Sequence, residues 1–206
     1  VKIKNQNIIE IGPGRGALTD GILKMQPKKL ILIEKDNLLT EELKLKYSKD
    51  KRVRIINCDI LKFNLENLLK ENYIIFGNLP YNISSQIIVK LIKLSWPPIF
   101  KNLVLMFQKE LAEKILGKFT TPNYGRISIL SNYRLNIIDK FRVSPNSFFP
   151  KPKVNSLVIH FEPKKKLSFN IKNMESIEKV TNILFSNKRK MINKSIKKIL
   201  CPKKLK

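Results

Sequence analysis

The sequence alternates short apolar runs with amphipathic segments over residues 1–116, and this alternation limits the possible folds more than any other feature. Five runs have the length and composition of buried strands: Asn7–Ile11, Leu30–Glu34, Val53–Asn57, Tyr73–Phe76 and Leu103–Phe107. Helix-like segments follow them: Ala17–Met25, Leu38–Tyr47, Leu65–Lys70, Ser84–Leu94 and Lys109–Leu116. Strands that alternate with helices through short links form a parallel, doubly wound sheet. We therefore predict an α/β, Rossmann-like fold.

The pattern changes after about residue 120. Leu135–Val143 and Ser156–Phe161 resemble two further strands, joined by the Pro-rich stretch "SPNSFFPKPKVNS", and they would form an antiparallel pair at the edge of a mostly parallel, seven-stranded sheet. A basic linker begins at Lys164 and leads to a segment that resembles two helices. We predict a main domain over residues 1–164 and a helical element over 165–206, which is too short for a robust core of its own.

Positive charge dominates the composition. The 206 residues include 41 Lys and Arg but only 16 Asp and Glu, which gives a net charge of +25. Lys, Asn and Ile are abundant together, so a compositional bias accounts for part of this excess. Such a charge still favours polyanions. Because no apolar run is long enough to span a bilayer and no strongly amphipathic helix is evident, we expect nucleic acid rather than membrane.

Residues for metal binding and nucleophilic catalysis are scarce. Cys58 and Cys201 are far apart and fit no zinc spacing, and His160 is the only histidine. We interpret Cys58 as a small buried apolar residue and His160 as a structural strand residue. We therefore predict neither a metal site nor Ser-His or Cys-His catalysis.

The first predicted strand ends in "IIEIGPGRGALT", where glycines open a helix. This arrangement allows backbone N–H groups to approach a ligand. Gly12, Gly14 and Ala17 also match the dinucleotide pattern G-x-G-x-x-G/A, and Glu34 follows about twenty residues later. NAD and S-adenosylmethionine both contain a ribose that such an acid can bind, so a nicotinamide-dependent dehydrogenase remains an alternative.

Three acidic residues lie near the ends of predicted strands. Glu34 could accept hydrogen bonds from ribose hydroxyls, which we favour over an exposed strand-end glutamate. Asp59 follows the third strand and could bind the exocyclic amine of an adenine, or it could be a helix N-cap. Glu10 precedes the glycines, and it is either oriented toward the loop or simply a polar strand residue.

The fourth predicted strand leads into "FGNLPYNISS". The Asn78 side-chain oxygen and the Leu79 carbonyl could accept the two N–H bonds of an exocyclic adenine amine, and Pro80 restricts the backbone just after them. Tyr81 could stack on the base. Such a clamp would hold the nitrogen for attack on a sulfonium methyl group without a strong base. The alternative is an Asn-x-Pro turn with a partly buried tyrosine.

Seven motifs occur in a family-specific order: "EIGPGRGALT", "LIEKD", "CDI", "GNLPYNIS", "LMFQKELAEKI", "YGRISIL" and "FFPKPKVNS". Over nearly its whole length the chain resembles the KsgA family of small-subunit rRNA adenine dimethyltransferases. The resemblance implies S-adenosyl-L-methionine as donor and the N6 amines of two adjacent adenines near the 3′ end of small-subunit rRNA as target. It also implies a monomeric, cytoplasmic enzyme that acts on the immature small ribosomal subunit.

The resemblance also implies roles for individual residues. The cofactor contacts of the family fall on Gly12, Glu34, Asp59 and Asn78, with Gly14 in the same glycine loop. Asn78, Leu79 and Tyr81 are then the catalytic residues.

Target and RNA contacts follow from the same resemblance. Phe148 aligns with the aromatic residue that sandwiches the target adenine with Tyr81, and Phe149 is the less favoured candidate. Either phenylalanine could instead cover the sheet edge as a loop residue. Lys188, Arg189 and Lys190 belong to a basic helical tail that would contact rRNA phosphates.

Two other functions remain possible for a protein with this fold. A 23S-type resistance methylase is disfavoured by "PKPKVNS" and the tail, and a mitochondrial relative that acts as a transcription factor is a binding-protein alternative. The chain begins after the "QNFL"-like segment of the family and stops before the usual end of its helical domain. From this we expect these 206 residues to bind the donor weakly and to methylate poorly.

Overall fold

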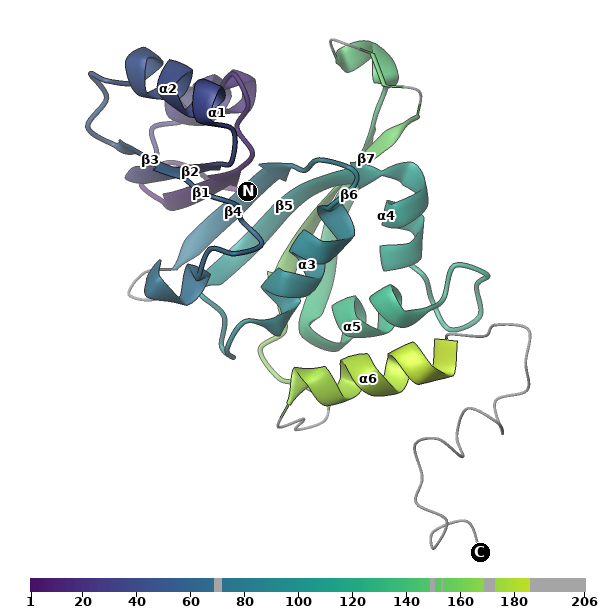
Figure 1. The fold of residues 1–206 in the computed structure, drawn as a ribbon. Helices are drawn as coiled ribbons and strands as arrows, with labels where there is room; N and C mark the ends of the chain where they lie inside the picture. The colour runs from purple at the N-terminus through teal and green to yellow at the C-terminus, as the bar shows by residue number, and fades with distance from the viewer. Residues whose placement is uncertain (69–71, 149–150, 153, 169–172, 186–206) are drawn as a thin grey trace, which may run out of the picture.

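The computed structural model describes residues 1–68, 72–148, 151–152, 154–168 and 173–185 (Figure 1). Its centre is a seven-stranded sheet with the strand order β3-β2-β1-β4-β5-β7-β6. The strands are β1 (Asn7–Ile11), β2 (Lys29–Glu34), β3 (Val53–Asn57), β4 (Tyr73–Asn78), β5 (Phe100–Gln108), β6 (Leu135–Val143) and β7 (Ser156–Pro163). All seven predicted strands are present, so the α/β prediction is confirmed.

Strand direction follows the prediction as well. β1 pairs in parallel with β2 and β4, β2 pairs in parallel with β3, and β4 pairs in parallel with β5. β7 runs antiparallel to both β5 and β6. The sheet is therefore parallel with an antiparallel edge, and the carboxyl ends of its parallel strands all meet at one rim.

Helices cover both faces of the sheet. They are α1 (Ala17–Lys24), α2 (Asn37–Lys46), α3 (Ser84–Lys93), α4 (Lys109–Ile115), α5 (Arg126–Arg134) and α6 (Met174–Phe185), with short 3-10 helices η1 (Leu65–Leu68) and η2 (Pro145–Ser147). α1 and α2 pack on one face of β1 and β2 through Ile22 and Leu43. α3, α4 and α5 cover the opposite face of the sheet (Figure 1).

Helix α5 was not anticipated from the sequence. Its buried face includes Ser128, Ser131 and Arg134, so the apolar repeat that identifies an amphipathic helix is weak. The Ser128 hydroxyl accepts a hydrogen bond from the Gly125 N–H at 2.8 Å and donates one to the Gly125 carbonyl at 2.6 Å. Hydrogen bonding by Ser128 thus fixes the start of a helix whose hydrophobic periodicity is weak.

Cys58 and His160 are structural in different ways. The His160 Nε2 atom lies 2.5 Å from the Asn102 Oδ1 atom on the adjacent strand, which confirms a structural strand histidine. Cys58 is a free thiol that packs against the main apolar cluster, as predicted, but it is half-buried rather than buried. It lies just past the end of β3, at the outer edge of the sheet. Within the described residues, no helix is both long and apolar enough to span a membrane.

Helix α6 is the first of the two helices predicted for residues 165–206, and it packs on α5 (Figure 1). The Glu178 carboxylate accepts hydrogen bonds from Arg126 Nη2 at 2.6 Å and from Lys93 Nζ at 2.9 Å. The second predicted helix lies outside the described residues. The division at residue 165 stays a prediction.

Candidate active site

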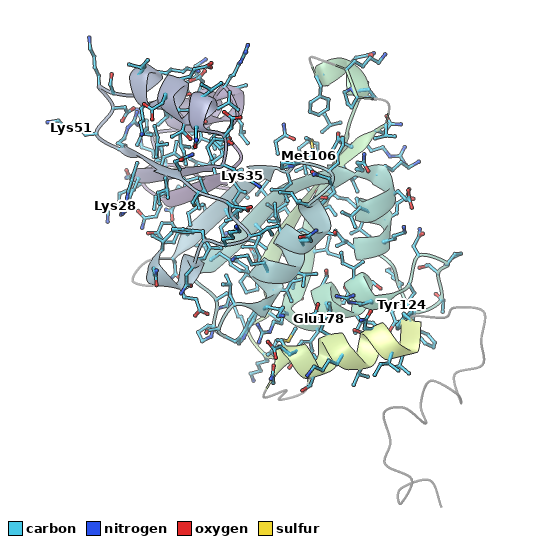
Figure 2. All side chains as sticks on the ribbon, in the orientation of Figure 1. Lys28, Lys35, Lys51, Met106, Tyr124 and Glu178 are labelled. Carbon is cyan, nitrogen blue, oxygen red and sulfur yellow. The ribbon has the colours of Figure 1, made fainter. Side chains whose placement is uncertain are left out.

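The carboxyl ends of β1, β2 and β4 bring three predicted site residues together. Ile11 pairs with Ile33 of β2 and with Gly77 of β4. The residues that follow these three in the chain are Gly12, Glu34 and Asn78, and so they lie at the same rim. In Figure 2, Met106 marks this rim because it is the β5 partner of Asn78. A parallel sheet of this order binds ligands at such a rim.

The glycine loop lies against the loop that follows β4. Gly12 has a φ of +67°, and a Cβ atom built there would lie 3.9 Å from both the Asn78 carbonyl oxygen and Pro80 Cδ. Gly16 has a φ of +83°, and its Cβ would lie only 2.3 Å from the Tyr47 hydroxyl. The left-handed backbone favours glycine at both positions, and lack of space does so at Gly16. The sequence-predicted loop therefore closely approaches the proposed clamp.

Glu34 is held by backbone amides at the mouth of the glycine loop. It is 8% exposed. Its Oε2 atom accepts a hydrogen bond from the Gly14 N–H at 3.2 Å, and its Oε1 atom accepts from the N–H groups of Lys35 and Asp36 at 2.8 and 3.0 Å. The alternative of an exposed strand-end glutamate was wrong. Oε1 already accepts two hydrogen bonds, whereas Oε2 accepts one and keeps a second lone pair that can accept a hydroxyl proton.

Asp59 combines a turn role with a position near the rim. Its Oδ1 atom accepts a hydrogen bond from the Leu61 N–H at 2.9 Å, and its Oδ2 atom lies 3.0 Å from Lys35 Nζ. The Leu61 hydrogen bond, followed by the Lys35 ammonium, holds the pKa of Asp59 below its ordinary value. Asp59 is thus an ionised turn-capping residue, and a ligand role is compatible with this geometry. Lys35, labelled in Figure 2, was missed, although "LIEKD" places it directly after the ribose-binding candidate.

The backbone after β4 is fixed by a buried leucine. Leu79 is buried, and a Cβ atom at Gly77 would lie 2.5 Å from Leu79 Cδ2, so a larger residue at position 77 would displace the Leu79 side chain. The Asn78 side chain is exposed, and no hydrogen bond within the described residues engages it. The Ile83 N–H donates to the Pro80 carbonyl at 3.2 Å. This turn therefore presents a free side-chain amide at the rim.

Tyr81 is held in place by a residue that is distant in the sequence. Its hydroxyl lies 2.7 Å from the Ser156 Oγ atom at the start of β7. Ser156 is buried and Tyr81 is half-buried. Sequence reasoning did not identify Ser156 as a site residue, although it is the last residue of the motif "FFPKPKVNS". The contact shows that this motif and "GNLPYNIS" meet in the folded protein.

Phe148 lies in the connection between β6 and β7. It is half-buried, and its N–H donates to the Pro145 carbonyl at 3.2 Å. Val143 pairs with Ser156, so this connection begins and ends beside the residue that holds Tyr81. Among the described residues, the Phe148 and Tyr81 rings form no stacked or edge contact. The remaining candidates, Phe149, Lys188, Arg189 and Lys190, lie outside the described residues.

Glu10 points into the sheet–helix interface beneath the glycine loop. It is 1% exposed, and its Oε2 atom accepts a hydrogen bond from Thr19 Oγ1 at 2.7 Å. Its location favours the first of the two readings left open above, because Thr19 belongs to the helix that the loop opens.

The family model for ribosomal RNA adenine dimethylases matches residues 1–206. This chain belongs to the ribosomal RNA adenine dimethylase family. The nicotinamide-dependent dehydrogenase alternative is thereby set aside.

Similar proteins agree with this assignment. The chain is 44% identical over 198 residues to "Ribosomal RNA small subunit methyltransferase A" of Pelagibacter ubique, covering 96% of this chain and 74% of the relative. A relative of the same name from Malacoplasma penetrans is 44% identical over 194 residues, covering 94% and 68%.

Two solved structures have the same fold as this chain. A dimethyladenosine transferase from Plasmodium falciparum superposes with a TM-score of 0.74 at 33% identity, covering 95% of this chain and 69% of that one. The 23S rRNA methyltransferase ErmE shares the fold, with a TM-score of 0.72 at 21% identity, covering 98% and 80%.

The dimethylase also has a hollow of about 1000 Å³ on the helical side. It is lined by residues of η1, α3, α4, α5 and α6, among them Val89, Lys90, Leu111 and Arg126, and Glu178 marks this region in Figure 2. None of the predicted site residues that the structure describes lines it.

Proposed function

We propose that this dimethylase transfers methyl groups from S-adenosyl-L-methionine to the N6 amines of two adjacent adenines near the 3′ end of small-subunit rRNA. The observation that carries the proposal is the convergence of Gly12, Glu34 and Asn78 at one rim, with the anchored Tyr81 beside them. The names of the 44%-identical relatives support the small subunit over the large subunit as the source of the substrate.

The residues at the rim fit the donor. Gly12 has no side chain between its backbone and a ligand at the rim, and the spare lone pair of Glu34 Oε2 offers an acceptor for a ribose hydroxyl. Asp59, held ionised, offers an acceptor for the amine of the donor adenine. The bound donor supplies an electrophilic methyl group on a positively charged sulfur.

The Asn78 side-chain oxygen and the Leu79 carbonyl would accept the two N–H bonds of the target amine and align its lone pair with the methyl group. As the new N–C bond forms, the S–C bond breaks and its electron pair stays on sulfur. The nitrogen then loses a proton to solvent. Positioning and electrostatics supply the rate enhancement. Tyr81, with its hydroxyl fixed to Ser156, would present its ring to the target base.

The target adenine must leave its stack to reach this clamp. Tyr81 and Phe148 would enclose the extruded base from two elements, β4–α3 and β6–β7. The net charge of +25 would attract rRNA phosphates, with Lys188, Arg189 and Lys190 among the contacts. We place the dimethylase in the cytoplasm as a monomer acting on the immature small subunit.

Mass spectrometry of rRNA after incubation of small subunits with isotopically labelled donor tests the proposal. We expect two adjacent N6,N6-dimethyladenines near the 3′ end of the small-subunit rRNA, and no label with the Asn78→Ala variant. Methylation of large-subunit rRNA would instead support the 23S-type alternative. RNA binding without any methylation would support a binding-protein role.

A further inference from the structure

Glu10 is a buried acid that the proposed chemistry does not use. It lies in β1, and its side chain shares a sheet face with Ile8, which packs among α1 and α2 residues. Its strand neighbours Leu32 and Phe76 are buried as well. Thr19 of α1 is its one hydrogen-bond partner within the described residues. The carboxyl group is therefore enclosed by apolar strands on one side and by the first turn of α1 on the other.

The charges that face Glu10 are negative. Asp20 projects from α1, and Glu34 lies at the end of β2. The nearby cation Lys46 of α2 is engaged by Asp20, with Nζ 2.7 Å from Asp20 Oδ2, and the Tyr47 hydroxyl donates to Asp20 Oδ1 at 2.6 Å. β4 contributes no charged residue to this region. Within the described residues no cation pairs with Glu10.

These surroundings give Glu10 an unusual protonation equilibrium. Burial raises its pKa to about 7, the Thr19 hydrogen bond opposes this rise, and Asp20 and Glu34 add to it. Desolvation disfavours the carboxylate because water no longer solvates it, and like charges disfavour it further. Near neutral pH, Glu10 is thus divided between its neutral and ionised forms.

We propose that Glu10 releases a proton when the cationic methyl donor occupies the glycine loop. This inference depends on the proposed function, because it takes the donor to be a sulfonium. The glycine loop begins two residues after Glu10, at Gly12, and it is continuous with the helix that carries Thr19. A positive charge brought to the loop stabilises the Glu10 carboxylate, which gains a counter-charge that the protein itself does not supply. The proton passes to the buffer.

Methyl transfer then reverses this change. The demethylated product, S-adenosylhomocysteine, contains a neutral thioether sulfur, so Glu10 loses part of its counter-charge and takes up a proton again. By reciprocity, donor binding must strengthen as pH rises through the pKa of Glu10. Each unit by which the donor lowers this pKa corresponds to about a tenfold gain in donor affinity across the window. Product binding should gain less, so donor-to-product selectivity increases with pH.

Isothermal titration calorimetry of the whole chain in phosphate and in Tris buffer measures this proton release directly. At pH 7 we expect wild-type protein to release more protons on binding S-adenosylmethionine than on binding S-adenosylhomocysteine. Glu10→Gln keeps the shape and the Thr19 contact but cannot ionise, and it should abolish this difference. Thr19→Val removes the hydroxyl that favours the carboxylate, and it should move the pH midpoint of donor affinity upward. Glu162→Gln, an exposed carboxylate on β7, is the matched control and should behave as wild type.

Equal proton release for donor and product in the wild-type protein would overturn the inference, and so would a Glu10→Gln variant that keeps the wild-type difference. The wild-type comparison alone tests the idea if a variant fails to fold. Complete absence of S-adenosylmethionine binding would overturn the proposed function itself. Binding with equal proton counts leaves that function intact and removes only the role of Glu10.

Discussion

The Tyr81 hydroxyl lies 2.7 Å from the Ser156 Oγ atom, although the two residues are 75 positions apart in the chain. Tyr81 follows β4 and Ser156 begins β7, so the hydrogen bond fixes the aromatic that we propose to stack on the target to the antiparallel edge of the sheet. A tyrosine held only by its backbone would sample several rotamers, whereas this one is held at both ends. Pre-organisation of this kind reduces the ordering cost when a base stacks on the ring.

Ser156→Ala and Tyr81→Phe should each lower methylation kcat by about fivefold, which corresponds to one hydrogen bond of about 1 kcal/mol. The KM for the donor should change little, because neither residue belongs to the glycine loop. In a double-mutant cycle, the combined variant should be no slower than either single variant, since both remove the same bond. Fully additive losses would show that the two residues act separately. Tyr81→Ala, which also removes the ring, should cost more than either.

Glu34→Gln should raise the donor KM by between about tenfold and a hundredfold, the range expected for charge-assisted hydrogen bonds. The NH2 group of the glutamine would face either the Gly14 N–H or the N–H groups of Lys35 and Asp36. Because all of these groups are donors, at least one hydrogen bond would be lost. The kcat at saturating donor should stay near wild type. Glu42→Gln, on the exposed surface of α2, is the matched control. A wild-type donor KM in Glu34→Gln would exclude this residue from donor binding.

The sheet could be predicted because its strands carry continuous apolar runs, and the rim followed from topology. Once β1, β2 and β4 are parallel neighbours, Gly12, Glu34 and Asn78 must lie together. Side-chain partners were less accessible. Nothing in the local pattern shows that Lys35 pairs with Asp59, because both are polar residues at loop positions where many geometries are possible.

Helix α5 shows a second limit of sequence reasoning. Its buried face combines Leu130 with two serines and an arginine, so hydrophobic periodicity reveals it only weakly. Glu10 shows the same limit for a single polar residue. Its burial depends on α1 closing over β1, and the sequence alone left its orientation open.

Gly16→Ala should destabilise the protein by about 1–3 kcal/mol, because a non-glycine residue is strained at a φ of +83° and its Cβ would overlap the Tyr47 hydroxyl. That hydroxyl donates to Asp20 Oδ1 at 2.6 Å and also lies 3.1 Å from the Gly16 carbonyl oxygen, so it cannot move away without losing these contacts. Gly21→Ala is the matched control in α1, where nothing lies within 4 Å of an added Cβ. It should stabilise by about 0.5–1 kcal/mol through helix propensity. Urea denaturation of both variants gives the comparison, and equal effects would contradict the steric argument.

Arg134→Met should lower the free energy of unfolding by about 2–4 kcal/mol, because Arg134 is a buried cation that satisfies the end of another helix. Its Nη1 atom donates to the carbonyl oxygens of Ile92 and Leu94 at 2.5 and 2.6 Å, and its guanidinium lies 4.9 Å from the centre of the Trp96 ring. Methionine fills much of the volume but leaves both carbonyls without a donor.

Arg54→Met on the exposed face of β3 is the matched control for Arg134→Met, and it should change the free energy of unfolding by less than about 0.5 kcal/mol. Burial lowers the pKa of Arg134 from its ordinary value, yet an arginine remains charged at neutral pH, so the loss should be independent of pH between about 6 and 8. Chemical denaturation at several pH values measures this directly. A pH-dependent loss, or equal effects for Arg54→Met and Arg134→Met, would show that the charged hydrogen bonds to α3 are not what holds α5 in place.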